Sequence, residues 1–189
     1  MTYNPDVRHR RSIRLKGYDY SKEGLYFVTI CVQNRECLFG EIKNGAMSLN
    51  DAGEIARHEL IDTPKHRKNV ILHEHIIMPN HVHIIIEIAA CRGVACYAQS
   101  LDIDTNTKYA NGTNLGVARY APTISTKPGT LSAIVRAYKS AVSKQLGFSY
   151  WQRNYYEHII RNERSYQKIS EYIQNNPQNW RNDKFYMEG

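Results

Sequence analysis

Two histidines, His81 and His83, stand two positions apart in a β-branched, apolar segment. On a β-strand, side chains at positions i and i+2 point to the same face of the sheet. The two imidazoles are therefore expected to converge on one metal ion, while Val82 packs into the core on the other side. Two ordinary histidines on a polar strand face are the alternative interpretation of this pair.

A second pair, His73 and His75, lies in the preceding apolar segment. All four histidines could form a zinc cluster across a hairpin, but such a closed site would leave no role for the rest of the chain. We expect His73 and His75 to be structural, or to contact the metal ligands without binding the ion themselves.

Tyr172 and Asn176 lie four residues apart in a helical pattern and therefore share one helix face. A hydroxyl and an amide oxygen would then point at whatever this face covers. The alternative is that Tyr172 is a packing aromatic and that Asn176 ends the helix before Pro177. Tyr138 is the rival reactive tyrosine, but it coincides with the apolar stripe of its own helix, so we expect it in the core.

Three separated motifs resemble the HUH single-tyrosine transposases, and most closely the REP-associated tyrosine transposases. They are MPNHVH at 78–83, WQRNYYEHIIRN at 151–162, and YIQNNP at 172–177 followed by Trp180. The resemblance covers most of residues 25–88 and 131–180. It implies a ferredoxin-like catalytic domain that uses a divalent metal ion, Mg²⁺ or Mn²⁺, and acts on single-stranded or hairpin DNA.

The resemblance also implies a role for each site residue. His81 and His83 match the metal-binding histidines, Asn176 matches the third metal ligand, and Tyr172 matches the nucleophile. The implied activity is DNA nicking and strand transfer through a 5′-phosphotyrosine intermediate. The alternatives are a relaxase or replication-initiator endonuclease with the same chemistry, and a noncatalytic nucleic-acid-binding domain. A homodimer is an open alternative to a monomer.

The net charge of the chain is +7. Clusters of basic residues indicate where the chain would contact a DNA backbone. Each phosphate that a basic side chain neutralises releases condensed counterions, so a dense cluster favours DNA binding. The first such cluster comprises Arg8, Arg10, Arg11, Arg14 and Lys16. The alternative interpretation of this cluster is a solvated basic tail.

A second predicted DNA contact combines Trp151, Arg153 and Arg161. Unpaired bases stack on aromatic rings while arginine holds phosphates. Packing of an edge strand is the alternative.

The composition places these residues in a globular protein rather than a disordered one, because 42% of the 189 residues are hydrophobic and 23% are charged. No apolar run approaches the ~20 residues of a membrane span, and the N-terminal residues do not resemble a signal peptide. We expect a cytoplasmic protein. The cysteine spacings, C-x5-C and C-x4-C, do not fit a zinc site, so we expect plain thiols.

The elements that must position the site follow from periodicity and turn signals. Pro64 is expected to end the first helix, which starts after an Asn50 cap. We expect a strand at 25–33, a hairpin at 38–49 turning at Asn44-Gly45, a helix from 51 to about Thr63, strands at 69–77 and 81–88, a helix at 131–146, a short strand within 150–161, a helix at 163–176, and a tail packed through Trp180 and Phe185.

This order predicts an α+β ferredoxin-like sandwich, with a mostly antiparallel sheet and helices on one face. We expect one catalytic domain over residues 1–189, with a basic N-terminal segment at 1–24. Residues 89–130 show no sustained period and are expected to be a flexible or dispensable insertion. A DNA-contacting or dimerising lobe is the alternative for this insertion.

Overall fold

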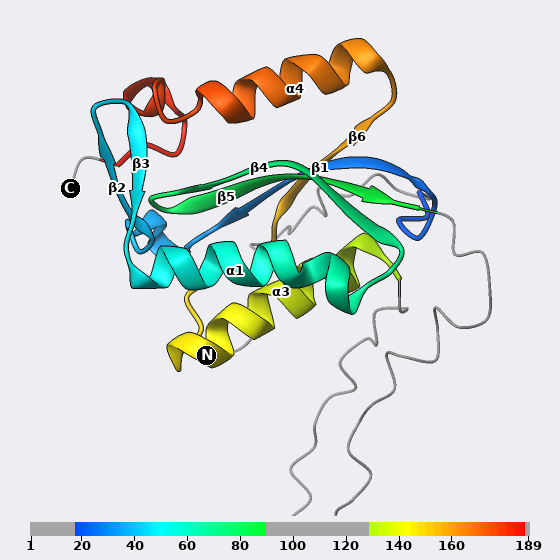
Figure 1. The fold of residues 1–189 in the computed structure, drawn as a ribbon, viewed down its shortest axis with the longest axis horizontal. Helices are drawn as coiled ribbons and strands as arrows, with labels where there is room; N and C mark the ends of the chain where they lie inside the picture. The colour runs from blue at the N-terminus through cyan, green and yellow to red at the C-terminus, as the bar shows by residue number, and fades with distance from the viewer. Residues whose placement is uncertain (1–17, 90–128, 188–189) are drawn as a thin grey trace, which may run out of the picture.

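An antiparallel sheet of four strands, in the order β4-β5-β1-β6, forms the centre of the computed structural model, which describes residues 18–89 and 129–187 (Figure 1). The elements are β1 (Gly24–Cys31), the short 3-10 helix η1 (Gln33–Arg35), β2 (Gly40–Lys43), β3 (Ala46–Leu49), α1 (Asp51–His66), β4 (Val70–Met78), β5 (His81–Ile88), α3 (Leu131–Leu146), β6 (Tyr156–Ile160), α4 (Glu163–Asn175) and η2 (Trp180–Asn182).

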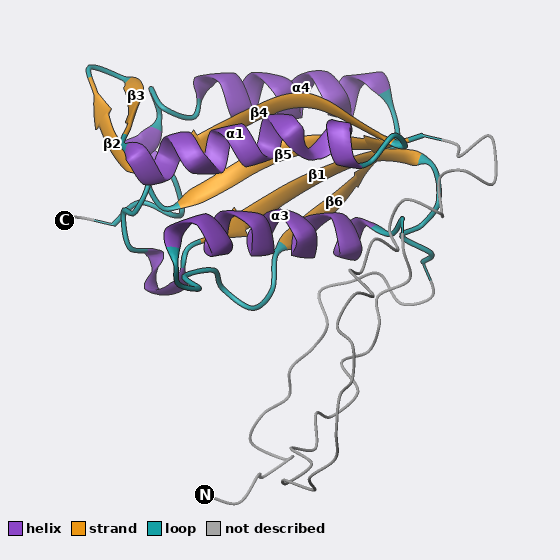
Figure 2. Ribbon diagram, turned by 60° about the horizontal axis from the view of Figure 1, so that its bottom comes forward, coloured by secondary structure: helices purple, strands orange, loops and turns teal. Residues whose placement is uncertain are grey.

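The sheet follows the ferredoxin-like β-α-β-β-α-β order, with β1, α1, β4, β5, α3 and β6 in sequence. Helices α1 and α3 lie side by side on one face of it, as Figure 2 shows. The predicted α+β class and antiparallel sheet are confirmed. The small hairpin β2–β3 turns at Asn44 and Gly45, both with positive φ, as expected from the sequence.

Helix α4 lies on the opposite face of the sheet from α1 and α3, so the expected placement of helices on one face applies only to those two (Figure 1). Its apolar stripe packs Ile173, with Tyr166 and Ile169, against Phe27 and Ile85 of the central strands. Both faces of the sheet are therefore covered.

Strand alternation divides the central strands between two cores. Val82, Ile84 and Ile86 of β5 face α1 and α3 together with Val28 and Ile30 of β1. His81, His83 and Ile85 alternate with them and face α4. The predicted division of β5, with the histidines on one side and Val82 on the other, is confirmed.

Side-chain caps begin α1 and α4, at Asn50 as the sequence predicts and at Asn162, which the sequence analysis did not name as a cap. Asn50 accepts a hydrogen bond from the backbone N–H of Gly53 at the start of α1, and Asn162 accepts one from Ser165 at the start of α4. The predicted end of α1 was wrong, because the helix continues through Pro64 to His66. Proline in a last turn costs only one intrahelical hydrogen bond, so the turn persists around it.

The basic cluster Arg8 to Lys16, and residues 90–128 of the predicted insertion, lie outside the described residues. No described helix combines the length and the apolar character needed to cross a bilayer.

Candidate active site

The two histidines of β5 face each other at the end of the sheet beneath α4. Their Nε2 atoms lie 2.9 Å apart, and the side chains are 0% and 1% exposed. Phe185 packs on the His81 ring with 4.6 Å between centroids, and Phe27 packs on the His83 ring at 5.3 Å. The Nε2 atoms of both imidazoles therefore point toward the same position, while the phenylalanine rings fix the orientation of the imidazoles.

Asn80 fixes the orientation and tautomer of His81. Its amide NH₂ donates to the backbone carbonyls of Arg35 and Phe185, at 3.0 and 2.9 Å. Its Oδ1, 2.9 Å from Nδ1 of His81, must therefore accept the hydrogen bond from that ring. The proton of His81 is on Nδ1, which leaves the lone pair of Nε2 free for a metal ion.

Thr29 holds the second ring from β1, with Oγ1 at 2.9 Å from Nδ1 of His83. A hydroxyl can donate or accept, so this contact is compatible with a proton on either nitrogen of His83. Without a metal, the short contact between the two Nε2 atoms needs a proton on His83 Nε2. A metal ion on Nε2 would require the proton on Nδ1 instead, and Thr29 Oγ1 would then accept the hydrogen bond from Nδ1.

Burial keeps both rings neutral, which is the state that metal ligation requires. It lowers the pKa of His81 to about 4, and the positive charge of Lys184 adds to the effect. Burial also lowers the pKa of His83 well below its ordinary value, with His81 and Lys184 contributing.

Tyr172, on the last turns of α4, points its hydroxyl into this group. The hydroxyl lies 3.2 Å from Nε2 of His83 and donates a hydrogen bond to Oδ2 of Asp183 at 3.0 Å. The residue is 39% exposed and borders a depression at the end of α4. Burial and the Asp183 carboxylate raise the pKa of Tyr172, so the resting hydroxyl is protonated.

Asp183 is the site residue that the sequence analysis missed. One carboxylate oxygen of Asp183 and one ring nitrogen from each of His81 and His83 lie within 4.8 Å of one another. This group can hold a metal ion. Asp183 follows η2 in the tail, and the only sequence signal near it was the expected packing of Trp180 and Phe185. Both are buried, which confirms that expectation.

Asn176, the expected third ligand, ends α4 and is 1% exposed. Its Nδ2 donates to Oδ2 of Asp183 at 2.9 Å, while its Oδ1 is buried without a hydrogen-bond partner among the described residues. An orphaned buried acceptor is costly unless a cation or a donor occupies the space beside it. The donor set of two imidazoles, a carboxylate and an amide oxygen therefore fits a divalent metal ion.

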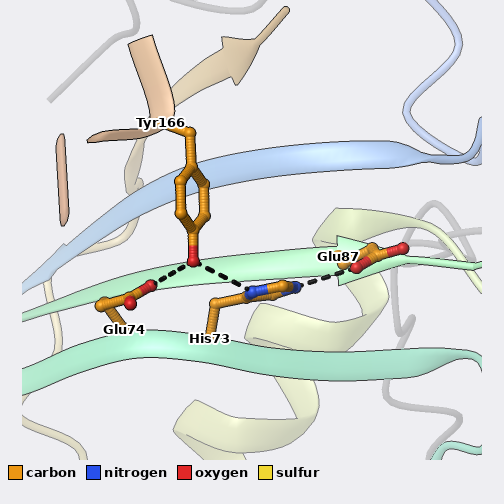
Figure 3. A network of polar contacts seen from close by, with 4 residues as sticks. All are labelled: His73, Glu74, Glu87 and Tyr166. Atoms are coloured by element: carbon orange, nitrogen blue, oxygen red, sulfur yellow. Dashed lines mark hydrogen bonds and ion pairs between the residues drawn. The ribbon is translucent and has the colours of Figure 1, made fainter. Parts of the chain in front are cut away.

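Polar contacts anchor α4 to the sheet at the end away from Tyr172. A β-bulge in β4 falls between Leu72 and His75, and the Tyr166 hydroxyl reaches both residues inside it. As Figure 3 shows, it donates to Glu74 at 2.6 Å and lies 3.3 Å from Nδ1 of His73, which in turn contacts Glu87 at 2.9 Å. His73 therefore helps to position the tyrosine helix and is separate from the His81–His83 group.

Tyr138 and Trp151, two other aromatic residues considered in the sequence analysis, are both buried. Tyr138 is buried and donates to the carbonyl of Ala56, as expected for a core residue. Trp151 is only 7% exposed, and its indole N–H donates to the backbone carbonyl of Lys139. Its ring is packed within the core, which leaves little of it for stacking on a DNA base.

Arg153 and Arg161 are exposed, and each lines a depression. The depression at Arg153 also includes Arg35 and is about 680 Å³. DNA contact by these arginines stays a prediction.

The fold is that of a REP-associated tyrosine transposase. The solved structure of that protein, bound to a REP hairpin, matches with a TM-score of 0.55 and 19% identity, over 87% of this chain and 72% of the other. By sequence, the chain belongs to the same family as an uncharacterised protein of Haemophilus influenzae, with 42% identity over 98% of both chains. No family model matches.

Replacing Asn80 with alanine is expected to destabilise the site and the tail together. The change removes the donor to two buried carbonyls and the acceptor for His81, and each buried group left unpaired costs about 1–3 kcal/mol. The free energy of unfolding, measured by urea denaturation, should fall accordingly. Asn80→Asp keeps the acceptor but not the donors, so it should not restore the loss. Wild-type stability of Asn80→Asp would contradict this role.

Replacing Tyr166 with phenylalanine is expected to lower stability near neutral pH by about 1–2 kcal/mol, because the Glu74 carboxylate loses its hydrogen bond. That bond holds the pKa of Glu74 below its ordinary value, so its stabilisation is present above about pH 4.5 and is lost as the pH falls through the folded-state pKa.

The difference in melting temperature between wild type and Tyr166→Phe should therefore narrow on acidification. Tyr156→Phe is the matched control, because the Tyr156 hydroxyl makes no hydrogen bond to a described residue. A difference that is constant from pH 7 to pH 3 would contradict the assignment.

Proposed function

We propose that this chain is a metal-dependent transposase that nicks single-stranded, hairpin-bearing DNA and transfers strands through a 5′-phosphotyrosine intermediate. The observation that carries the proposal is the position of the Tyr172 hydroxyl, 3.2 Å from His83 Nε2 and 3.0 Å from Asp183 Oδ2. The fold shared with a transposase that binds a REP hairpin supports this substrate class.

The tyrosine oxygen attacks the phosphorus of the scissile phosphodiester. A bond forms between phosphorus and the phenolic oxygen, and the bond between phosphorus and O3′ breaks. O3′ leaves with the electron pair and takes a proton from solvent, which gives a free 3′-OH. The phosphotyrosine conserves the energy of the broken bond, so a second strand's 3′-OH can reverse the step without ATP.

Asp183 receives the proton of Tyr172 in this proposal, which is supported by the hydrogen bond that its Oδ2 accepts from that hydroxyl. The amide of Asn176 donates to the same oxygen and keeps the carboxylate turned toward the tyrosine. A divalent ion held by His81, His83 and Asp183, with Asn176 Oδ1 as a further ligand, would supply positive charge for the scissile phosphate.

The direct test is incubation of the purified chain with end-labelled hairpin oligonucleotides and Mn²⁺, followed by a denaturing gel. A labelled band at the mass of protein plus DNA is the expected result. Loss of that band on protease treatment identifies the adduct as covalent. Tight binding of the hairpin without any adduct would instead favour a noncatalytic DNA-binding domain.

Asp183→Asn is expected to slow adduct formation by about 10²–10⁴, the usual contribution of a positioned general base. Asn176→Ala should cost less, about 10- to 100-fold, because it removes one supporting group around the ion. Single-turnover rates on one hairpin measure both. Equal rates for wild type and Asp183→Asn would exclude Asp183 from the proton transfer.

A further inference from the structure

A depression of about 540 Å³ opens beside Tyr172, at the end of α4 and the segment that follows it. Its size lies within the range of small-molecule sites. Tyr172, Asn176 and Asp183 form its boundary with the active site. The part that the proposed chemistry does not use consists of Lys168, Glu171, Asn175, Asn179, Asn182 and Lys184.

Lys184 is held by aromatic rings rather than by a carboxylate. Its Nζ lies 4.8 Å from the centroid of Phe185 and 5.2 Å from that of Tyr156. Among residues 18–89 and 129–187, no carboxylate pairs with it. A cation that is fixed in position but unpaired is suited to binding an anion.

The asparagines supply a different kind of contact. An amide group carries both donors and an acceptor, so it can pair with the edge of a nucleobase. In the described part of the chain, the side chains of Asn175 and Asn182 make no hydrogen bond, whereas Asn179 donates to the carbonyl of Asn175. Two free amides therefore face the depression.

The cation and the amides each suit a different part of a nucleotide. Lys184 is suited to a phosphate, because no described carboxylate pairs with it. The free amides of Asn175 and Asn182 suit the donors and acceptors of a base edge.

We propose that this depression binds the nucleotide adjoining the cleaved phosphodiester, with Lys184 contacting its phosphate and Asn175 and Asn182 contacting its base edge. The inference rests on the proposed function, because it places a DNA strand across Tyr172. It adds a site of sequence preference that is built from residues outside the catalytic group.

Equilibrium binding to single-stranded dA20, dC20 and dT20 tests the site, measured by fluorescence anisotropy at several salt concentrations. Tyr172→Phe serves as the parent protein, so that no covalent capture intervenes. Adding Lys184→Gln should weaken binding and reduce the slope of log K against log salt by about 0.7, the value for one phosphate contact in a single strand. Lys184→Arg should restore both.

Lys65→Gln is the matched control, because Lys65 lies at the end of α1, on the other face of the sheet. It should leave affinity and slope unchanged. The double variant Asn175→Ala/Asn182→Ala should change the ratio of affinities among the three homopolymers by about fivefold or more. Its salt slope should equal that of the parent.

An unchanged slope for Lys184→Gln would overturn the phosphate contact. Equal affinity of the parent for all three homopolymers, or an unaltered ratio in the double variant, would overturn the base contact. Absence of any binding by the parent would overturn the whole site. These results are independent of adduct formation, so failure of the proposed chemistry would appear separately, in the gel assay with wild-type protein.

Discussion

Tyr172→Phe is expected to abolish the covalent protein–DNA adduct and strand transfer completely, while hairpin binding persists. The substitution removes a single oxygen, and no other described group lies at that position to form the phosphotyrosine. Stability should change by only about 1 kcal/mol, because the ring keeps its contacts with Phe27 and His83. Denaturing gels and thermal melting of the same preparation measure both properties.

Tyr138→Phe is the matched control for this experiment. Its hydroxyl is also hydrogen-bonded but lies in the core between α3 and α1, where it donates to the backbone carbonyl of Ala56. This variant should lose a little stability and keep its adduct. A Tyr172→Phe protein that still forms covalent DNA would refute the nucleophile assignment, whatever its stability.

Removing divalent metal with EDTA is expected to eliminate adduct formation, and added Mn²⁺ should restore it. The metal should also stabilise the folded chain, since it binds a site that the unfolded chain lacks. At 100 times its Kd the gain is about 2.7 kcal/mol, or roughly 5–11 °C in Tm for a chain of this size. This thermal shift can be measured without DNA.

His83→Gln should lose both the Mn²⁺-dependent adduct and the thermal shift, because a neutral amide replaces a ring that faces His81 at 2.9 Å. His73→Gln is the matched control: His73 lies on the neighbouring strand and contacts Glu87 and Tyr166 instead. It should keep both responses. A thermal shift that survives in His83→Gln would locate the metal elsewhere.

The parts of the site that depend on local periodicity were predictable from the sequence. A strand repeats every two residues, so His81 and His83 had to share a face once β5 was recognised. A helix brings i and i+4 together, so Tyr172 and Asn176 had to lie at one end of α4. The predicted cap at Asn50 is local in the same sense. These features need only short-range geometry.

The tertiary structure alone decided how those local pairs meet. The contact between Tyr172 and His83 spans 89 residues, and the one between Asn80 and Phe185 spans 105. Asp183 enters the site only because the tail folds back beneath α4, which no periodicity in the tail indicates. Trp151 was predicted to contact DNA because Arg153 and Arg161 lie near it in the sequence. In the structure it is buried in the core against α3. Such contacts depend on which apolar faces remain exposed after the helices and strands form. The packing of the whole chain, and not any local segment, determines which faces then meet.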